Sequence, residues 1–200
     1  ISHKLAVRFI SDSPSPEVVD SLAQVFTQSD GDTRQFLRAL IQSDAFKSSA
    51  GQKFKKPLDF FISALRVTDA SIKLNQRNGR MLQKHLELLG QVPFTWSPPN
   101  GFPDYEEYWS TTSGLLDRWN FGMLLVTNQI RGVEVDLNQL TKDAASAQDV
   151  VDVLSLQFLG QLLPDNARSI LVDFASSGNL DANIPSIAGL ILGSPHFQMR

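Results

Sequence analysis

The sequence predicts an all-α fold, an irregular multi-helix bundle interrupted by one long loop rich in proline and aromatic residues. Three observations lead to this class. Apolar residues recur at helical spacing along most of the chain, capping residues precede these stripes, and only residues 93–109 lack a helical pattern over a long distance. With 42% apolar and 20% charged residues, the chain has an ordinary globular composition. We expect one helical domain over 1–200, with 1–132 and 133–200 as an alternative subdivision.

Helix-start signals organise the first part of the chain. Ser15 before Pro16 reads as an N-cap followed by proline at the first helical position. Asp32 is expected to cap the next helix, Pro57 to begin another, and Asn78 with the following glycine to precede a fourth. The expected helices are 2–10, 16–29, 33–41, 57–65, 80–89 and 113–131. The last of these carries Leu115, Leu116, Trp119, Met123, Val126 and Ile130.

The second part of the chain begins with an alternating stretch, 133–137, which we expect to be extended but for which the sequence offers no partner strand. Ser146 and Asp149 form a variant capping box with aspartate in the usual glutamate position. Pro164 breaks the pattern that follows. The remaining helices are expected over 147–162, 165–177 and 185–192.

All five Trp and Tyr residues lie between positions 96 and 119, and most belong to the loop 93–109. A loop this long and this aromatic is either a plug that packs on the core or a binding surface. As a binding surface, its contact residues are expected to be Trp96, Phe102, Tyr105, Tyr108 and Trp109.

Arg118 follows the loop on the next helix. A guanidinium at this position can hold loop carbonyl oxygens, pair with Asp104 or Glu107, or bind an anionic ligand. We favour a buried clamp that fixes the loop, because a loop with many prolines has to satisfy its carbonyl groups somewhere.

Asp104, Glu106 and Glu107 are the only tight acidic cluster near the aromatic residues. Such carboxylates can serve as acid and base on a sugar, or as oxygen ligands for calcium. The structural alternative, which we favour, is that Asp104 caps a short turn over 105–109, where the positive end of the helix dipole stabilises negative charge. The spacing of a calcium loop is absent.

Several catalytic classes lack their signature residues. The chain has no cysteine, its histidines at positions 3, 85 and 196 lie far apart, and it contains no G-x-S-x-G, phosphate-loop or dinucleotide motif. We therefore expect no metal and no cofactor. His85, between leucines at helical spacing, is interpreted as a packed or surface residue.

Positive charge is concentrated between residues 47 and 84, which hold nine basic residues against Asp59 and Asp69. Binding of an anionic polymer is one interpretation, and a basic helical pair lying against an acidic neighbour in the same fold is the one we favour. No aromatic residues interleave with the basic ones, so nucleic acid is not the expected partner. No apolar run reaches the roughly 18 residues that a membrane span needs.

Six segments together resemble the DUF-eighteen-hundred family, a large bacterial family of unknown function. They are HKLAVRFISDSP (3–14), GDTRQFLRALIQSDAF (31–46), KKPLDFFISALR (55–66), LGQVPF…PPNGFP (89–103), LLDRWNFGMLL (115–125) and LILGSPHFQ (190–198). The family loop usually has tryptophan where this chain has Phe102. The resemblance implies a bacterial source, the C-terminal part of a longer protein, and export from the cytoplasm to the periplasm or beyond. It implies no activity or cofactor.

Two function hypotheses from different classes follow. The first is a non-catalytic binding or assembly module of an exported bacterial protein, with loop 93–109 contacting a cell-surface polymer or a partner protein. The alternative is a polysaccharide-type hydrolase that uses the loop carboxylates. A weaker alternative is a binder of anionic polymer through 47–84. The lack of a convergent catalytic set favours the first.

Overall fold

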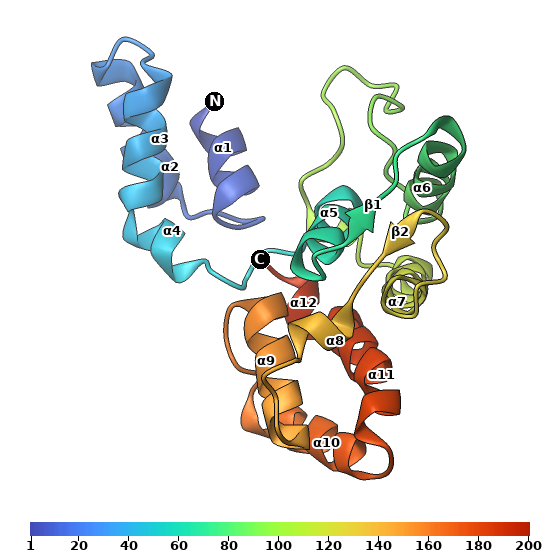
Figure 1. Cartoon of the computed structure of the whole chain (residues 1–200). Coiled ribbons are helices and arrows are strands. Elements are labelled where there is room, and N and C mark those ends of the chain that lie inside the picture. The colour runs from blue at the N-terminus through green and yellow to red at the C-terminus, as the bar shows by residue number, and fades with distance from the viewer.

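The computed structural model describes residues 1–200, and its regular elements are nearly all helices (Figure 1), which confirms the predicted all-α class. The helices are α1 (Ser2–Phe9), α2 (Pro16–Gln28), α3 (Thr33–Gln42), α4 (Asp44–Ser48), α5 (Pro57–Val67), α6 (Gln76–Leu88), α7 (Thr112–Val126), α8 (Leu137–Leu140), α9 (Ala147–Leu159), α10 (Asp165–Ser176), α11 (Leu180–Gly193) and α12 (Pro195–Gln198). A 3-10 turn, η1 (Glu106–Tyr108), and two strands, β1 (Ser71–Ile72) and β2 (Val133–Glu134), complete the chain. None of these helices combines the length and the apolar character needed to cross a bilayer.

Three predicted capping residues begin helices as expected. The Ser15 hydroxyl accepts the Val18 N–H, and Pro16 occupies the first position of α2. The Asp32 carboxylate accepts two backbone N–H groups at the start of α3. Ser146 accepts the Asp149 N–H, and the Asp149 carboxylate in turn accepts the Ala145 N–H. These contacts are local in sequence, and therefore the pattern was sufficient to predict them.

Two predicted helix starts are wrong. The α6 helix begins at Gln76 because the Asn75 side chain caps it, and Asn78 lies inside the helix, where its amide donates to the Lys73 carbonyl oxygen at 2.7 Å. The α11 helix begins five residues before Pro185 because Asn179 supplies the cap. In both cases an asparagine cap outweighed the turn signal downstream of it.

The extended segment expected over 133–137 is a strand only at Val133–Glu134, because α8 already begins at Leu137, but this strand does have a partner. β2 pairs antiparallel with β1, with Ser71 opposite Glu134 and Ile72 opposite Val133. The Asn128 side chain extends this arrangement, because it donates to the Val135 carbonyl oxygen and accepts the Val135 N–H. The helix α7 accordingly ends at Val126, several residues before the predicted end.

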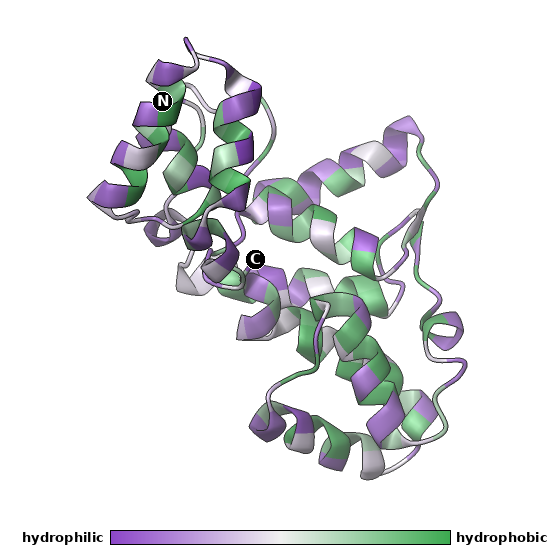
Figure 2. Ribbon diagram, turned by 90° about the vertical axis from the view of Figure 1, so that its left-hand side faces the viewer, coloured by the Kyte–Doolittle hydropathy of each residue, from purple (hydrophilic) through white to green (hydrophobic).

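The apolar residues form two separate clusters. The smaller one holds only five buried residues within α1, α2, α3 and the turn after α1: Ala6, Ile10, Leu22, Phe36 and Leu40. The larger one contains 24 buried residues from α5 to α12 and draws on both sides of position 132. Figures 1 and 2 both show α1 to α4 grouped to one side of the other helices. We call residues 1–48 the N-terminal unit and residues 57–198 the body.

The centre of the body is the contact between α7 and α11, where glycines allow close approach. A Cβ atom at Gly189 would lie 2.2 Å from the Met123 sulfur, and one at Gly122 would lie 3.3 Å from the Leu192 Cβ. Such short contacts exclude a larger side chain unless a neighbour moves. The buried face of α7 comprises Arg118, Phe121, Gly122, Leu125 and Val126. Leu115, Leu116 and Trp119, which the sequence pattern placed on the apolar stripe, are exposed instead.

Arg118 is the buried clamp that the sequence predicts, but it does not hold the aromatic loop. Its side chain is only 1% exposed, donates to the Gln198 amide oxygen at 2.9 Å and donates to the Lys55 carbonyl oxygen at 2.8 Å. The guanidinium also lies over the Phe54 ring, 4.4 Å from its centroid. Burial lowers the pKa of Arg118 to about 10, so it remains charged at neutral pH. The clamp therefore ties α7 to the segment before α5 and to the end of the chain.

We predict that Arg118→Ala lowers the free energy of unfolding by about 2–4 kcal/mol, because it leaves two sheltered acceptor oxygens without a donor. Thermal and urea denaturation measure this change. Arg131 is exposed and makes no ion pair, so Arg131→Ala is the matched control and should change stability by less than about 0.5 kcal/mol. Equal stability of the two variants would contradict the clamp.

Candidate functional site: an anchored aromatic loop beside an apolar groove

The aromatic loop is organised by a chain of ring contacts. The Trp96 and Phe102 ring centroids lie 5.0 Å apart, those of Phe102 and Trp109 6.0 Å apart, and those of Tyr108 and Trp109 6.4 Å apart. Trp109 is buried, and its indole N–H donates to the Pro103 carbonyl oxygen at 3.1 Å. Trp109 thus supports the loop from inside, and the rings stacked on it give the loop a defined shape.

Asp104 fastens the loop to the rest of the molecule. Its carboxylate accepts hydrogen bonds from Arg8 at 2.7 Å and from Lys56 at 2.9 Å, and its carbonyl oxygen accepts one from the Lys53 ammonium at 2.8 Å. Burial alone would raise the pKa of Asp104, but these hydrogen bonds and the charges of Lys56 and Arg8 outweigh it and leave the pKa below its ordinary value. Asp104 is therefore an ionised anchor.

A second carboxylate, Asp12 of the N-terminal unit, makes the reciprocal contact. It pairs with the buried Lys53 and accepts the backbone N–H of Glu106 at the start of η1. The predicted turn is thus present, but its capping carboxylate comes from Asp12 and not from Asp104. Together these residues form what we call the clasp: Arg8, Asp12, Lys53, Lys56 and Asp104.

The opposite side of the loop leaves aromatic rings in solvent. Tyr108 is 56% exposed and Tyr105 39% exposed, while Trp96 and Phe102 are partly buried in the ring stack. Glu107 is exposed and makes no ion pair or side-chain hydrogen bond. In Figure 1 the loop projects beyond α5 and α6.

An apolar groove of about 540 Å³ lies next to the loop, between the start of α7 and the end of the chain. Its exposed wall consists of Leu115, Leu116 and Trp119, and Glu106 also lines it. A Cβ atom at Gly193 would lie 2.9 Å from the Trp119 ring, so the indole rests on the glycine backbone. We call Tyr105, Tyr108, Leu115, Leu116 and Trp119 the loop–α7 surface.

The model of the family described as "Protein of unknown function (DUF1800)" matches residues 1–199. The chain belongs to the DUF1800 family. No curated protein and no solved structure matches it.

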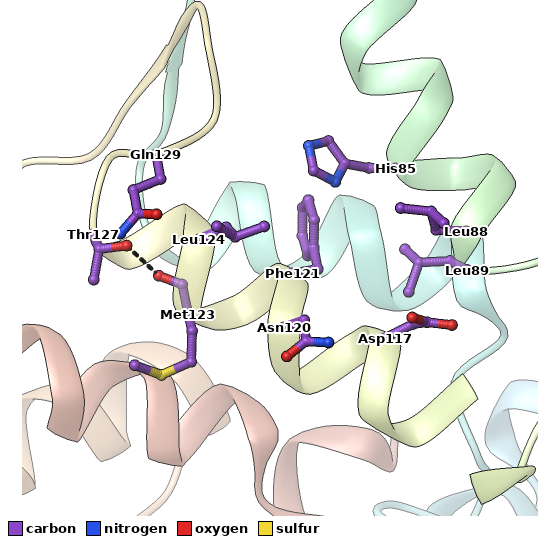
Figure 3. A pocket seen from close by; sticks show the side chains of 10 residues that line it. All are labelled: His85, Leu88, Leu89, Asp117, Asn120, Phe121, Met123, Leu124, Thr127 and Gln129. Atoms are coloured by element: carbon purple, nitrogen blue, oxygen red, sulfur yellow. Dashed lines mark hydrogen bonds between the residues drawn. The ribbon is translucent and has the colours of Figure 1, made fainter. Parts of the chain in front are cut away.

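The DUF1800 chain has a second groove, of about 480 Å³, between α6 and α7 (Figure 3). In it the His85 ring points toward Phe121, with 5.5 Å between the ring centroids, and burial lowers the pKa of His85. Asp117 and Asn120 also line the groove and make no hydrogen bond through their side chains. Sequence reasoning missed this groove, because its only signal was a histidine among leucines. No group of three or more His, Asp or Glu side chains has a metal-binding arrangement.

Four of the nine basic residues in the segment 47–84 are engaged with distant parts of the fold. Lys53 and Lys56 belong to the clasp, and Lys73 pairs with Glu134 across the small sheet at 2.6 Å. The Lys55 ammonium lies 3.6 Å from the centroid of the Phe197 ring. These four positive charges therefore face acidic and aromatic neighbours from distant parts of the chain, whereas the other five make no such contact.

We predict that Asp104→Asn lowers stability at pH 7 by about 1–2 kcal/mol, a value reduced for the partial exposure of the pair. The folded pKa of Asp104 is depressed, so its contribution is full above the ordinary pKa and is lost as the pH falls through the folded value. The difference in melting temperature between the variant and the native chain should therefore shrink below about pH 4.

The control for this prediction is Glu107→Gln, which makes the same chemical change at an unpaired carboxylate of the same loop. It should leave the melting temperature and the rate of proteolytic cleavage in 93–109 unchanged, whereas Asp104→Asn should accelerate cleavage. A pH-independent difference, or equal effects of the two variants, would show that the clasp is not the anchor.

Proposed function

We propose that the chain is a non-catalytic binding module of an exported bacterial protein and that it holds a cell-surface polymer or a partner protein on the loop–α7 surface. One observation carries this proposal. The loop is fastened by Asp104 and Trp109 on one side, while its other side and the adjoining groove expose large aromatic and aliphatic side chains. Rigid, exposed aromatic side chains bind partners at a low cost in conformational entropy.

The state of Asp104 supports binding over catalysis. A hydrolase of the two-carboxylate type needs one group that donates a proton, and this requires a raised pKa. The pKa of Asp104 is lowered because the ion pairs with Lys56 and Arg8 outweigh the effect of burial. Both cations bind its Oδ1 atom, and Asp104 does not line the groove, so it is not placed to act as an acid there.

We predict that Tyr108→Ala and Leu116→Ser each weaken partner binding at least about tenfold, equivalent to about 1.4 kcal/mol, without changing the melting temperature. A glycan array identifies the ligand, and calorimetric titration of that glycan gives the affinities. Ile170→Ser changes a residue that is 67% exposed on α10 and serves as the matched control. Unchanged affinity in both surface variants would contradict this role of the surface.

The version with a protein partner has its own test. A photo-crosslinking amino acid at position 116 of the full-length protein, expressed in its bacterial host, should capture a partner that the same group at position 170 does not capture. Crosslinks of equal yield and identity at the two positions would count against a specific surface. The same cells report whether the protein is exported, because the crosslinked species can be assayed in each cellular fraction.

A polysaccharide hydrolase is the second candidate, and one observation favours it: Glu106 is the loop carboxylate that lines the apolar groove. If the chain cleaves the polymer that it binds, Glu106→Gln should lower the release of reducing ends by at least about a hundredfold, as expected for a lost acid or base. Glu107→Gln should retain full activity. Release of reducing ends that is equal in the two variants excludes Glu106 from this role.

A further inference from the structure

A cleft of about 450 Å³ lies at the seam where the N-terminal unit meets the linker 49–56 and Arg200, and it shares no lining residue with the groove beside the loop. Four elements meet there: the end of α1, the end of α3 with α4, the linker before α5, and the last residue of the chain. Figure 1 shows the C-terminus beside this linker. Sites between structural units are common places for small ligands.

The charged lining of this cleft is entirely basic. Arg8, Lys47, Lys53 and Arg200 line it, and no acidic residue does. Three of these cations have carboxylate partners, Asp104, Asp12 and Asp59. Lys47 contacts only Asp44 of its own short helix, at 3.5 Å, and both side chains are largely exposed. Lys47 is thus free to turn toward a ligand, since an exposed pair of this kind contributes little.

The surroundings of the cleft contain more positive than negative charge. The single carboxylate of Asp104 pairs with two cations, Arg8 and Lys56. Lys55 and Arg118 have no carboxylate within ion-pair distance. Burial, and then the charge of Arg118, lowers the pKa of Lys55 to about 8, and Arg200 adds to this effect although Asp59 opposes it. An anion in the cleft would relieve this mutual repulsion.

The rest of the lining is apolar and partly in solvent. Phe9 is 43% exposed and Ile41 is 54% exposed, although each is adjacent in the chain to a core residue of the N-terminal unit, Ile10 and Leu40 respectively. Phe46 of α4 continues this wall. Large apolar side chains next to a group of cations favour a ligand that has both an apolar part and a negative charge.

We propose that the seam cleft binds a small anionic amphiphile, a molecule with a carboxylate or phosphate head and an apolar chain. The head lies among Arg8, Lys47 and Arg200, and the chain covers Phe9 and Ile41. This site shares no lining residue with the loop–α7 surface, and it differs from the binding of an extended anionic polymer because the apolar wall requires an attached chain.

The test is a calorimetric titration of the intact chain with octanoate and octyl phosphate, kept below their micelle concentrations. Octanol lacks the charge, acetate lacks the chain, and octylammonium reverses the charge. We expect one or both anionic amphiphiles to bind, and the other three probes to bind at least about tenfold more weakly. The preference between the two anions identifies the head group. Equal binding of octanoate and octylammonium, or no binding of either anion, would overturn the proposal.

Variants locate the site without disturbing the fold. Lys47→Gln and Ile41→Ser change exposed side chains and should each weaken binding of the preferred anion about threefold to tenfold. The matched controls are Lys84→Gln and Leu74→Ser, which are exposed and distant from the cleft in the chain. Tyr108→Ala should also leave this binding unchanged. A failure of the seam-cleft proposal can therefore be distinguished from a failure of the proposed function. Equal losses in test and control variants would overturn the assignment of the site.

Discussion

Four consecutive residues, 53–56, connect the separate parts of this molecule. Their main chain exchanges hydrogen bonds with residues 198–200, and the Lys55 carbonyl oxygen among them receives Arg118. Their side chains reach Asp12 of the N-terminal unit and Asp104 of the aromatic loop. A linker that would otherwise be a flexible connection is thus fixed by the body, the chain end, the loop and the N-terminal unit together. The positive charge of this segment follows from its position, because two carboxylates from distant segments converge on it.

The N-terminal unit depends on this attachment. Its hydrophobic cluster of five buried residues is too small to make the unit stable in isolation by the usual relation between size and buried area. Its ties to the clasp and to Arg200 are polar: Arg8 contacts Asp104 with its side chain and Arg200 through its carbonyl oxygen. Polar contacts of this kind fix the orientation of the unit but add little to the free energy of unfolding, because the cost of desolvating the charges offsets much of their attraction. The seam therefore has a defined geometry and remains partly open to solvent, which explains why a cleft persists there.

The sequence was sufficient for features whose partners are close in the chain. Caps such as Ser15 and Asp32 bond to groups two or three residues away, and periodicity identified most helices. The sequence pattern failed for α7, because Leu115 and Leu116 were wrongly assigned to its buried face. The true buried face has ideal helical spacing and consists of Arg118, Phe121, Gly122, Leu125 and Val126. Because its first residue is an arginine, the stripe does not look apolar in the sequence. The partners of Arg118 lie 63 and 80 residues away, and no local pattern specifies such contacts.

The separation of contacting residues along the chain also explains which part of the candidate site could be predicted from the sequence. The aromatic composition of the loop was sufficient to identify an organised segment, and its ring contacts are indeed close in sequence. The face of the loop that is attached to the rest of the fold is set by the ion pair between Asp104 and Arg8, which lie 96 residues apart. No local pattern in the sequence indicates this pair. Arg8 also lines the seam cleft, so one guanidinium belongs both to the clasp that anchors the loop and to the cleft. A substitution at Arg8 would disturb the loop anchor and the cleft at once. The ligands of the two surfaces can be distinguished only by substituting side chains that belong to one surface alone. Tyr108 is such a residue for the loop, and Lys47 is one for the cleft.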